Sequence, residues 1–415
     1  MPSDPKLKSD LFIKNLLMCL AFFGAVAVFF LSYVFISGDA GLLAGNSFLN
    51  WDAQHYDFIR RNGYADFRVA FFPLFPLVWK LTAFSPAGIS LLNGGVFIVS
   101  FAALTAALKI QADKYFFLLL SFPGLLFMFL PYSEAVFFLS ASLLLAGLHK
   151  KNDLLVVSGL LLCSFARPVA YIFIPALFIT EFLCAAGIRE FLKKSLMYSG
   201  VVLLGLLLTL AVQYHYTGNW FAFFEAQKGW GNYFRIPQFP LTSWAGGNIV
   251  RLDGTALLIG LTAAGFSVFW VWKKVKGRIA FEKKELVFSV LYLAGISLFV
   301  LLFRGGWLFS LNRFVFSTPF FLVACYYFLP SLNLTRKYFL YVFLFLSVYW
   351  FWFASYVHIQ SLLKYEALTV FLILFLLTGS RHKTISRVAF AVCLLGNIFL
   401  TVYLYHKFLG GGWVG

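Results

Sequence analysis

Long apolar runs separated by short polar stretches dominate the chain. A helix of about 20 apolar residues crosses the hydrocarbon core of a bilayer, and backbone groups in lipid must be satisfied within helices or a closed barrel. The runs are much longer than barrel strands, so they predict helices. Several are shorter than a full crossing, so we expect some to be tilted, broken or re-entrant. The predicted spans, about thirteen, lie at residues 14–37, 88–108, 115–130, 133–148, 154–167, 170–187, 196–215, 255–272, 286–303, 315–330, 338–356, 366–379 and 389–409.

The composition supports a membrane protein. Hydrophobic residues make up 61% of the chain and charged residues only 12%, which is half of the roughly 25% typical of soluble domains. The predicted fold class is all-α, a polytopic transmembrane helical bundle that forms one domain over residues 1–415. The first apolar run, from Leu16 to Ile36, is too long for the core of a signal peptide and predicts a retained helix.

Basic residues predict the orientation of the bundle. The net charge is +17, and lysine and arginine gather in every second loop, as the positive-inside rule expects of cytoplasmic loops. This explains the charge without nucleic acid, which we exclude as a partner. The N-terminus is therefore predicted to be cytoplasmic, and the long loops 38–87 and 216–254 non-cytoplasmic. The basic stretches are residues 6–14, 109–114, 149–151, 189–194, 273–284, 336–337 and 381–387.

Signatures of soluble enzymes are absent from the sequence. There is no GxxxxGK[ST], HExxH, CxxC or GxSxG motif, so ATP hydrolysis and zinc chemistry are unsupported. The five cysteines lie in or beside apolar runs without metal-ligand spacing, where cysteine acts as a small hydrophobe. No cofactor is predicted, and dependence on a divalent metal stays open.

The first outer loop holds the densest group of polar and aromatic residues. Asn50 is a predicted helix cap and Gly63 a predicted helix end. A short helix between them would lie in the membrane interface with one face formed by Trp51, His55, Phe58 and Ile59.

Asp52 is the leading catalytic candidate in this loop. It falls in the first turn of the predicted helix, where a carboxylate can simply complement the helix dipole. Six residues from Trp51 to Tyr56 nevertheless combine Trp, Asp, Gln, His and Tyr beside a membrane span, which favours a functional role. His55 and Tyr56 either bind substrate or anchor the interface. Pro73 and Pro76 follow, as a rigid wall or a helix start.

Charged residues at outer membrane depth are further candidates. Glu134 and Arg167 interrupt apolar runs, so each must face a cavity or a partner, in a catalytic site or a structural ion pair. Arg304 and Arg313 bracket Gly305-Gly306-Trp307, where they either bind phosphate or extend to the interface.

Gln227 and Trp230 lie three residues apart in the second outer loop, so they share a helical face. They are candidate substrate-binding residues. The alternative is an amphipathic surface helix, to which Glu225 and Lys228 would also belong.

Together these segments resemble the multi-spanning GT-C glycosyltransferases, and more narrowly the relatives of the second mannosyltransferase of GPI-anchor assembly. Arg167 stands where that family has an Arg-Ser-Asn-Gly motif, but Pro168-Val169-Ala170 replaces its last three residues. The other matching segments are Trp51-Asp52-x-x-His55-Tyr56 with Gly63-Tyr64, Ala70 to Pro76, Pro131 to Ala135, Tyr216-Thr217-Gly218 with Ala226-Gln227 and Trp230, and Asn312-Arg313-Phe314.

The resemblance implies a GT-C-like first outer loop with short interfacial helices, and an inverting transfer of a sugar, mannose first, from a polyprenyl- or dolichyl-phosphate donor. The acceptor would be a glycan or glycolipid outside the cytosol, in the plasma membrane of a prokaryote or the endoplasmic reticulum of a eukaryote. Such chemistry needs a base and cations for the leaving phosphate. Asp52 is the expected base, with Glu134 assisting, and Arg167, Arg304 or Arg313 the phosphate ligand.

Two other classes fit parts of the pattern. A transporter or flippase of a lipid-linked sugar shares the bundle and the buried charges, but places its charges near the bilayer midplane. A structural assembly subunit would not need Asp52, Glu134 and Arg167 together. The enzyme is the favoured interpretation.

Overall fold

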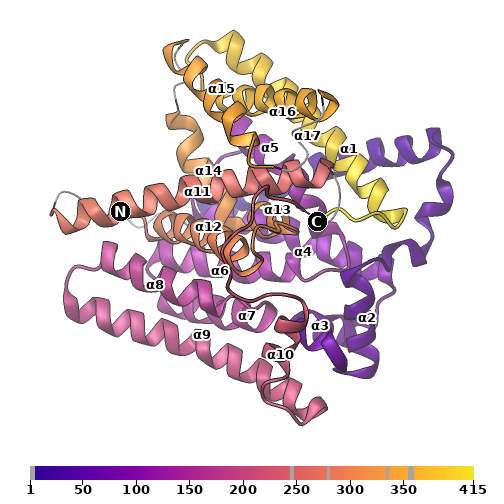
Figure 1. Cartoon of the computed structure of the whole chain (residues 1–415), viewed down its shortest axis with the longest axis vertical. Coiled ribbons are helices and arrows are strands. Elements are labelled where there is room, and N and C mark those ends of the chain that lie inside the picture. Colours follow the sequence, from indigo (N-terminus) through magenta and orange to yellow (C-terminus); the bar gives the residue numbers. More distant parts are fainter. Residues whose placement is uncertain (1–4, 244–246, 278–280, 333–335, 354–358) are drawn as a thin grey trace.

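The computed structural model describes residues 5–243, 247–277, 281–332, 336–353 and 359–415. This part of the chain is almost entirely helical, and its β-structure is limited to two isolated bridges. Figure 1 shows the arrangement of the helices. They are α1 (Pro5–Ile36), α2 (Asp52–Asn62), α3 (Leu74–Thr82), α4 (Pro86–Ala107), α5 (Lys114–Leu120), α6 (Glu134–Lys150), α7 (Asp153–Ala166), α8 (Ala170–Cys184), α9 (Ile188–Thr217), α10 (Ala222–Gly229), α11 (Gly247–Val275), α12 (Lys284–Phe303), α13 (Leu311–Phe316), α14 (Pro319–Phe328), α15 (Arg336–Trp350), α16 (Ile359–Leu377) and α17 (Lys383–Leu409).

The structure supports a multi-pass membrane protein. Seven described helices are long and apolar enough to cross a bilayer, and a bent pair, Pro123–Phe129 with α6, brings the number to eight. Four shorter apolar helices of 10–17 residues add to the bundle, so a total of about thirteen spans stays a prediction. The seven long helices are α1 from Asp10, α4, α9, α11 from Ile249, α12, α16 and α17.

Two predicted spans are not continuous helices. The predicted span 115–130 divides into α5 and a 3₁₀ helix, Pro123–Phe129, which meets α6 at 107°. The predicted span 315–330 divides into α13 and α14 at Pro319. Proline lacks the amide N–H and clashes with the preceding turn, so each break falls just before a proline. Part of the predicted span 338–356 falls on residues 354–358, outside the described residues.

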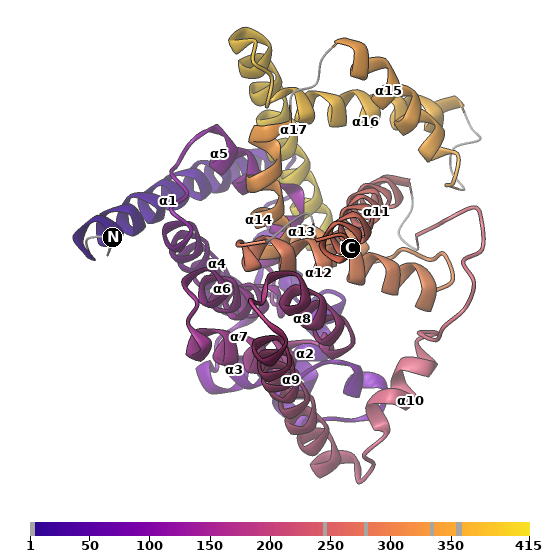
Figure 2. The same cartoon turned by 90° about the vertical axis from the view of Figure 1, so that its left-hand side faces the viewer.

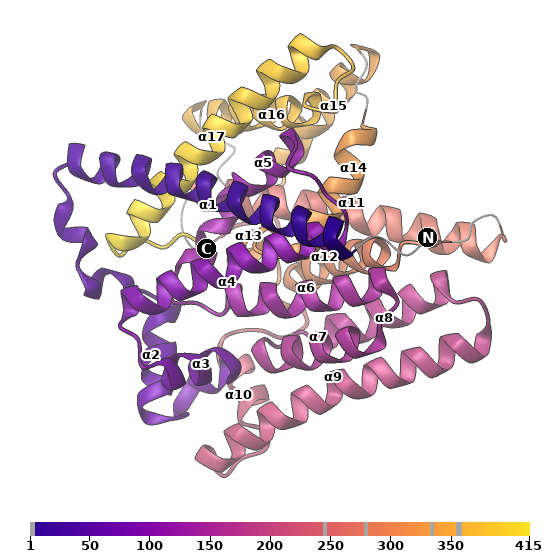
Figure 3. The ribbon, with the colours of Figure 1, turned by 180° about the vertical axis from the view of Figure 1, so that it is seen from behind.

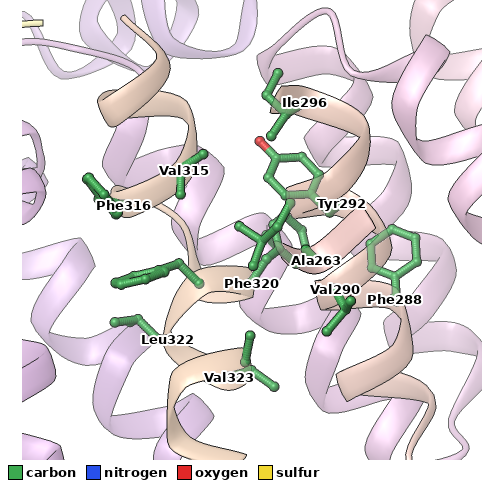
Figure 4. Packing of buried hydrophobic residues seen from close by; sticks show 14 of the residues in the cluster. Ala263, Phe288, Val290, Tyr292, Ile296, Val315, Phe316, Phe320, Leu322 and Val323 are labelled. Atoms are coloured by element: carbon green, nitrogen blue, oxygen red, sulfur yellow. The ribbon is translucent and has the colours of Figure 1, made fainter. Parts of the chain in front are cut away.

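The core lies between α12 and the helices packed around it. α12 contacts α8, α11 and α14, and Figure 4 shows Phe288, Tyr292 and Ile296 of α12 close to Phe320 of α14. The Tyr292 and Phe320 ring centroids are 4.2 Å apart. The Tyr292 hydroxyl donates to the Phe314 carbonyl at 3.3 Å, which fixes α13 above this core.

Polar contacts collect at the two ends of the long helices. At one end, α2, α3 and α10 lie together (Figures 1 and 3). At the other end, His149 pairs with Glu285 at 3.0 Å and Lys284 with Glu181 at 2.6 Å. The predicted site and the basic loops around 149–151 and 283–284 therefore lie at opposite ends of the bundle. The cytoplasmic side of the membrane stays a prediction from the positive-inside rule.

The first long loop, which is predicted to lie on the outer side, forms the α-helices α2 and α3 together with short 3₁₀ helices, but its details differ from the prediction. Trp51, not Asn50, is the N-cap residue of α2. The Asn50 amide instead donates to the carbonyls of Ser47 and Phe408, both at 2.8 Å, because the end of α17 packs against this loop. Gly63 ends α2 as predicted, with a φ of 80° that favours glycine.

The buried face of α2 is also different from the predicted one. Ala53, Tyr56 and Ile59 are buried, since α2 packs on α3 and on the bundle rather than lying free in the interface. Tyr56 contacts Phe71 and Phe75 with ring centroids 5.1 and 4.9 Å apart. The second long loop, also predicted to lie on the outer side, is shorter than predicted, because α9 continues to Thr217 and α11 begins at Gly247.

Candidate active site

Two carboxylates and two arginines that are distant in sequence meet at one end of the bundle. Glu134, the first residue of α6, is fully buried. It accepts hydrogen bonds from Arg167, the C-cap residue of α7, and from Arg313 of α13. Arg313 also pairs with Asp52 of α2, with Nη1 2.7 Å from Oδ2. The predicted ion pair at Glu134 and Arg167 is thus present, and the four charges sum to zero.

Neighbouring polar groups hold this charge cluster in place. Ser133 Oγ lies 3.0 Å from the Tyr56 hydroxyl and 3.2 Å from Arg167 Nε, and accepts from both. Burial, together with nearby Glu134 and Asp52, raises the pKa of Tyr56, so its phenol stays protonated. Burial alone would lower the pKa of Arg313, but Glu134 and Asp52 more than offset this and raise it above its ordinary value.

The backbone at Trp51 directs Asp52 toward the cluster. Trp51 has φ 55° and ψ −122°, a conformation that costs free energy for a residue with a side chain. Its indole Nε1 donates to the Gly411 carbonyl at 3.1 Å. Asp52 Oδ2 is held by Arg313, whereas Oδ1 has no ion-pair or hydrogen-bond partner among the described residues. One carboxylate oxygen is therefore available to a substrate.

A cavity of about 190 Å³ opens beside the cluster. One wall is apolar and comes from α8 and α12. The other walls combine polar and aromatic side chains and come mainly from the two long loops, α13 and the segment after α17. The apolar wall includes Tyr171, Ile172, Ile296, Phe299 and Val300, the aromatic residues elsewhere include Phe71, Phe72, Trp230, Phe309, Phe314 and Trp413, and the polar residues include Asp52, Tyr56, Ser133, Arg167, Gln227, Asn232, Arg304 and Arg313.

Arg304 differs from the other two arginines of this cavity. It follows α12, and its Nε donates to Asn232 Oδ1 at 3.0 Å while its Nη1 donates to the Phe309 carbonyl. Both partners are neutral, and within the described ranges Arg304 forms no ion pair with a carboxylate. Burial lowers the pKa of Arg304 to about 10, so the guanidinium stays charged at neutral pH.

A stretch of chain between α10 and α11 supports Arg304. Residues 233–242 run beside residues 302–308, and backbone hydrogen bonds join them, such as Tyr233 N to Phe303 O at 3.0 Å and Thr242 N to Gly306 O at 3.1 Å. We call residues 232–242 the strap. It brings Asn232 to Arg304, and Asn232 Nδ2 in turn donates to Gln227 Oε1 at 2.7 Å.

Asp253 is a buried carboxylate that the sequence analysis missed. It lies in the second turn of α11 and accepts from Asn312 N at 2.8 Å, Asn312 Nδ2 at 2.7 Å and Ser243 Oγ at 2.6 Å. Asn312 directly precedes Arg313, so Asp253 ties α11 to the helix that carries this arginine. A carboxylate at the start of an apolar run was the available signal.

The predicted site residues divide into three groups. Those that line the cavity are Asp52, Tyr56, Arg167, Gln227, Trp230, Arg304 and Arg313. Glu134 does not line the cavity and contacts it through the two arginines. Trp51 and His55 also do not line it: Trp51 packs on Trp413, and His55 packs on Phe67 and Phe71.

His55 lies among aromatic side chains, one helical turn after Asp52. Burial lowers its pKa below the ordinary 6.5, although Asp52 acts in the opposite direction. Phe67 joins His55 to Trp230, with ring centroids 5.3 and 5.7 Å away from those of the two residues. His55 therefore supports the aromatic side of the site in its neutral form.

Trp413 is the second residue that the sequence analysis missed. It lines the cavity although it comes from the end of the chain, where the sequence shows only hydrophobic and glycine residues. No pattern of polar residues marked this segment.

Comparison with family models, with curated proteins and with solved structures finds no match to this chain. The cavity itself indicates which chemistry this site can support. It offers one accessible carboxylate oxygen, one guanidinium without a carboxylate partner, and an apolar wall. In the described part of the chain, no group of three or more His, Cys, Asp or Glu side chains could hold a metal ion.

Proposed function

We propose that this protein is an integral membrane glycosyltransferase. It moves a sugar, with mannose as the favoured one, from a polyprenyl- or dolichyl-phosphate donor to a glycan or glycolipid acceptor. The observation that carries the proposal is that Asp52 and Arg304 line the same cavity, which also has an apolar wall. The resemblance of Trp51-Asp52-x-x-His55-Tyr56 and its companion segments to the GT-C glycosyltransferases supports the same conclusion.

The reaction is a single inverting displacement. The acceptor hydroxyl attacks the anomeric carbon while Asp52 Oδ1 accepts its proton, and a positioned base contributes about 100- to 10,000-fold to rate. The new bond joins the anomeric carbon to the acceptor oxygen. The bond to the phosphate oxygen breaks, and the leaving lipid phosphate keeps the electron pair. Arg304 neutralises the charge that develops there. One carboxylate suffices as the base, because the lipid phosphate leaves as an anion that needs no general acid, and a single inverting displacement forms no covalent glycosyl intermediate.

Arg304 is the preferred phosphate ligand of the three candidate arginines. Arg167 and Arg313 already share the carboxylate of Glu134, and Arg313 also holds Asp52. A phosphate would have to compete with these buried ion pairs. Arg304 would exchange only neutral partners, and a guanidinium fork matches phosphate oxygens well.

The apolar wall suits the lipid part of the donor. Tyr171 of α8 stacks on Phe299 of α12, with ring centroids 4.1 Å apart, and Tyr171 is 44% exposed. The wall thus continues from the cavity to the outer surface of the bundle. Without a donor, this apolar surface would contact membrane lipid. A bound prenyl chain would cover it instead.

The test uses purified protein in lipid nanodiscs with polyprenyl-phosphate mannose. Release of polyprenyl phosphate is measured by mass spectrometry, with and without octyl α-mannoside as an acceptor. Asp52→Asn should slow release by about 100- to 10,000-fold while donor binding persists. Asp57→Asn is the matched control, because Asp57 lies on the same helix and pairs with Arg61 at 3.0 Å outside the cavity.

Three results would contradict the proposal. Intact donor after long incubation with the wild-type protein would exclude the transfer, and movement of that intact donor between leaflets would favour a flippase. Near-normal release by Asp52→Asn would remove Asp52 from the mechanism. Loss of both release and donor binding would make Asp52 a binding or folding residue.

A further inference from the structure

The segment after α17 turns back into the site. Gly410–Gly415 follows the last helix, and Figure 2 shows the end of the chain close to α13 and α12. Gly411 adopts a φ of 82°, which allows the tight turn, and Gly412 N donates to the Lys407 carbonyl at 2.8 Å. Val414 is buried beyond the turn. This segment is therefore packed into the bundle and presents Trp413 to the cavity.

Trp413 is coupled directly to the residue before the proposed base. Its ring meets the ring of Trp51 edge to face, with centroids 5.0 Å apart, and Trp51 donates to Gly411 at 3.1 Å. Trp413 and Asp52 both line the cavity, so Trp413 shares this cavity with the carboxylate that would accept the proton. Arg304, the proposed phosphate ligand, is held by the strap and the end of α12, on separate elements.

An aromatic wall at this position fits one substrate chemistry. The acceptor must bring a hydroxyl to Asp52, and a sugar acceptor also carries an apolar face of C–H groups. Tryptophan offers a large rigid surface that buries such a face at little entropic cost. Trp230, the C-cap residue of α10, lines the same cavity, so a ring bound near Asp52 has aromatic walls from two segments.

We propose that Trp413 forms an acceptor subsite that binds the pyranose ring of a glycoside next to Asp52. The proposal rests on the proposed function for the role of the bound sugar. The subsite itself is a statement about glycoside binding, which is measurable without catalysis.

The experiment measures binding of octyl α-mannoside to the full-length protein in nanodiscs by tryptophan fluorescence. Wild-type protein should show saturable quenching. Trp413→Phe should abolish most of that signal while keeping a weaker aromatic platform, and Trp413→Ala should weaken binding about ten-fold, measured by competition. Trp220→Phe is the matched control, because Trp220 stacks on Tyr214 outside the cavity and is 47% exposed.

The kinetic arm separates binding from support of the fold. Trp413→Ala should raise the KM for octyl α-mannoside by a factor about ten times the factor by which it raises the KM for polyprenyl-phosphate mannose. In Trp413→Phe, the KM for octyl α-mannoside should return part of the way to the wild-type value. Equal losses for both substrates would make Trp413 a structural clamp and overturn the proposal.

The outcomes for the two proposals are distinct. If the wild-type protein binds octyl α-mannoside through Trp413 but never cleaves the donor, the subsite stands and the transferase function fails. If quenching is absent, or is unchanged in Trp413→Phe, the subsite is wrong whatever the enzyme assay shows.

Discussion

Arg304 offers the sharpest test of how the donor is held. Substitution by Gln removes the charge, and substitution by Lys keeps the charge but loses the planar fork. The structure isolates this residue, because its partners Asn232 and Phe309 are neutral whereas Arg167 and Arg313 are committed to Glu134. We therefore expect the donor phosphate to depend on Arg304 more than on either of the others.

The expected magnitude follows from the value of a charged hydrogen bond. Such a bond contributes about 1.5–3 kcal/mol, and each 1.4 kcal/mol corresponds to about ten-fold in affinity. Arg304→Gln should therefore weaken donor binding by roughly 10- to 150-fold, and Arg304→Lys should fall between it and the wild-type protein. Turnover at saturating donor should also fall, because the charge on the leaving phosphate grows in the transition state.

The assay pairs donor affinity with release of polyprenyl phosphate on the same folded variants. Arg61→Lys is the control, since Arg61 is a 59% exposed arginine of α2 that pairs with Asp57 and does not line the cavity. Normal affinity and normal turnover in Arg304→Lys would refute the reasoning. A larger effect from Arg167→Lys would move the phosphate to the Glu134 cluster.

Three further predictions test other parts of the site. Asp253→Asn keeps the size of the side chain but replaces one accepting oxygen with an amide NH2, so a hydrogen bond to Asn312 or Ser243 is lost; turnover should fall about ten-fold with donor affinity retained, and equal loss of both would indicate general unfolding. Burial lowers the pKa of His55, so the unfolded chain binds a proton more readily than the folded protein. The free energy of unfolding should therefore decrease as the pH falls below about 6.5. In denaturation experiments, His55→Gln should remove the part of this decrease that comes from His55. Cysteines at Asn46 and Gln238, both exposed, should react with an impermeant thiol reagent from the non-cytoplasmic side in a cysteine-free background, and labelling from the cytoplasmic side alone would reverse the orientation.

The sequence indicated most of the site because charged residues in an apolar chain are conspicuous. Asp52, Glu134, Arg167 and Arg313 could each be selected from their surroundings, since a charge at membrane depth needs a partner. Which of them pair with one another could not be read, because the contacts join positions as distant in sequence as Asp52 and Arg313. From the sequence, the three arginines were therefore equivalent candidates for the phosphate ligand. The structure distinguishes Arg304, because its hydrogen-bond partners are neutral whereas those of Arg167 and Arg313 include Glu134.

Residues with a local signal were predicted less well when distant segments competed for them. Asn50 has the ideal side chain for a helix cap, yet it binds the Phe408 carbonyl from the end of α17. Hydrophobicity alone also did not show that the run 115–130 breaks before Pro123. Trp413 had no local signal, because its role comes entirely from where the chain folds back.

The full burial of Glu134 between two arginines has a consequence for how this protein can change over generations. Loss of Glu134 alone would leave the buried Arg167 without a carboxylate and Arg313 with Asp52 as its remaining partner, and breaking a buried ion pair by removing one partner costs about 3–5 kcal/mol. Joint replacement of Glu134 and Arg167 by uncharged residues of similar volume avoids much of that penalty. Positions 134, 167 and 313 should thus be inherited as a set, and a lineage that loses one of these charges should carry a compensating change at another.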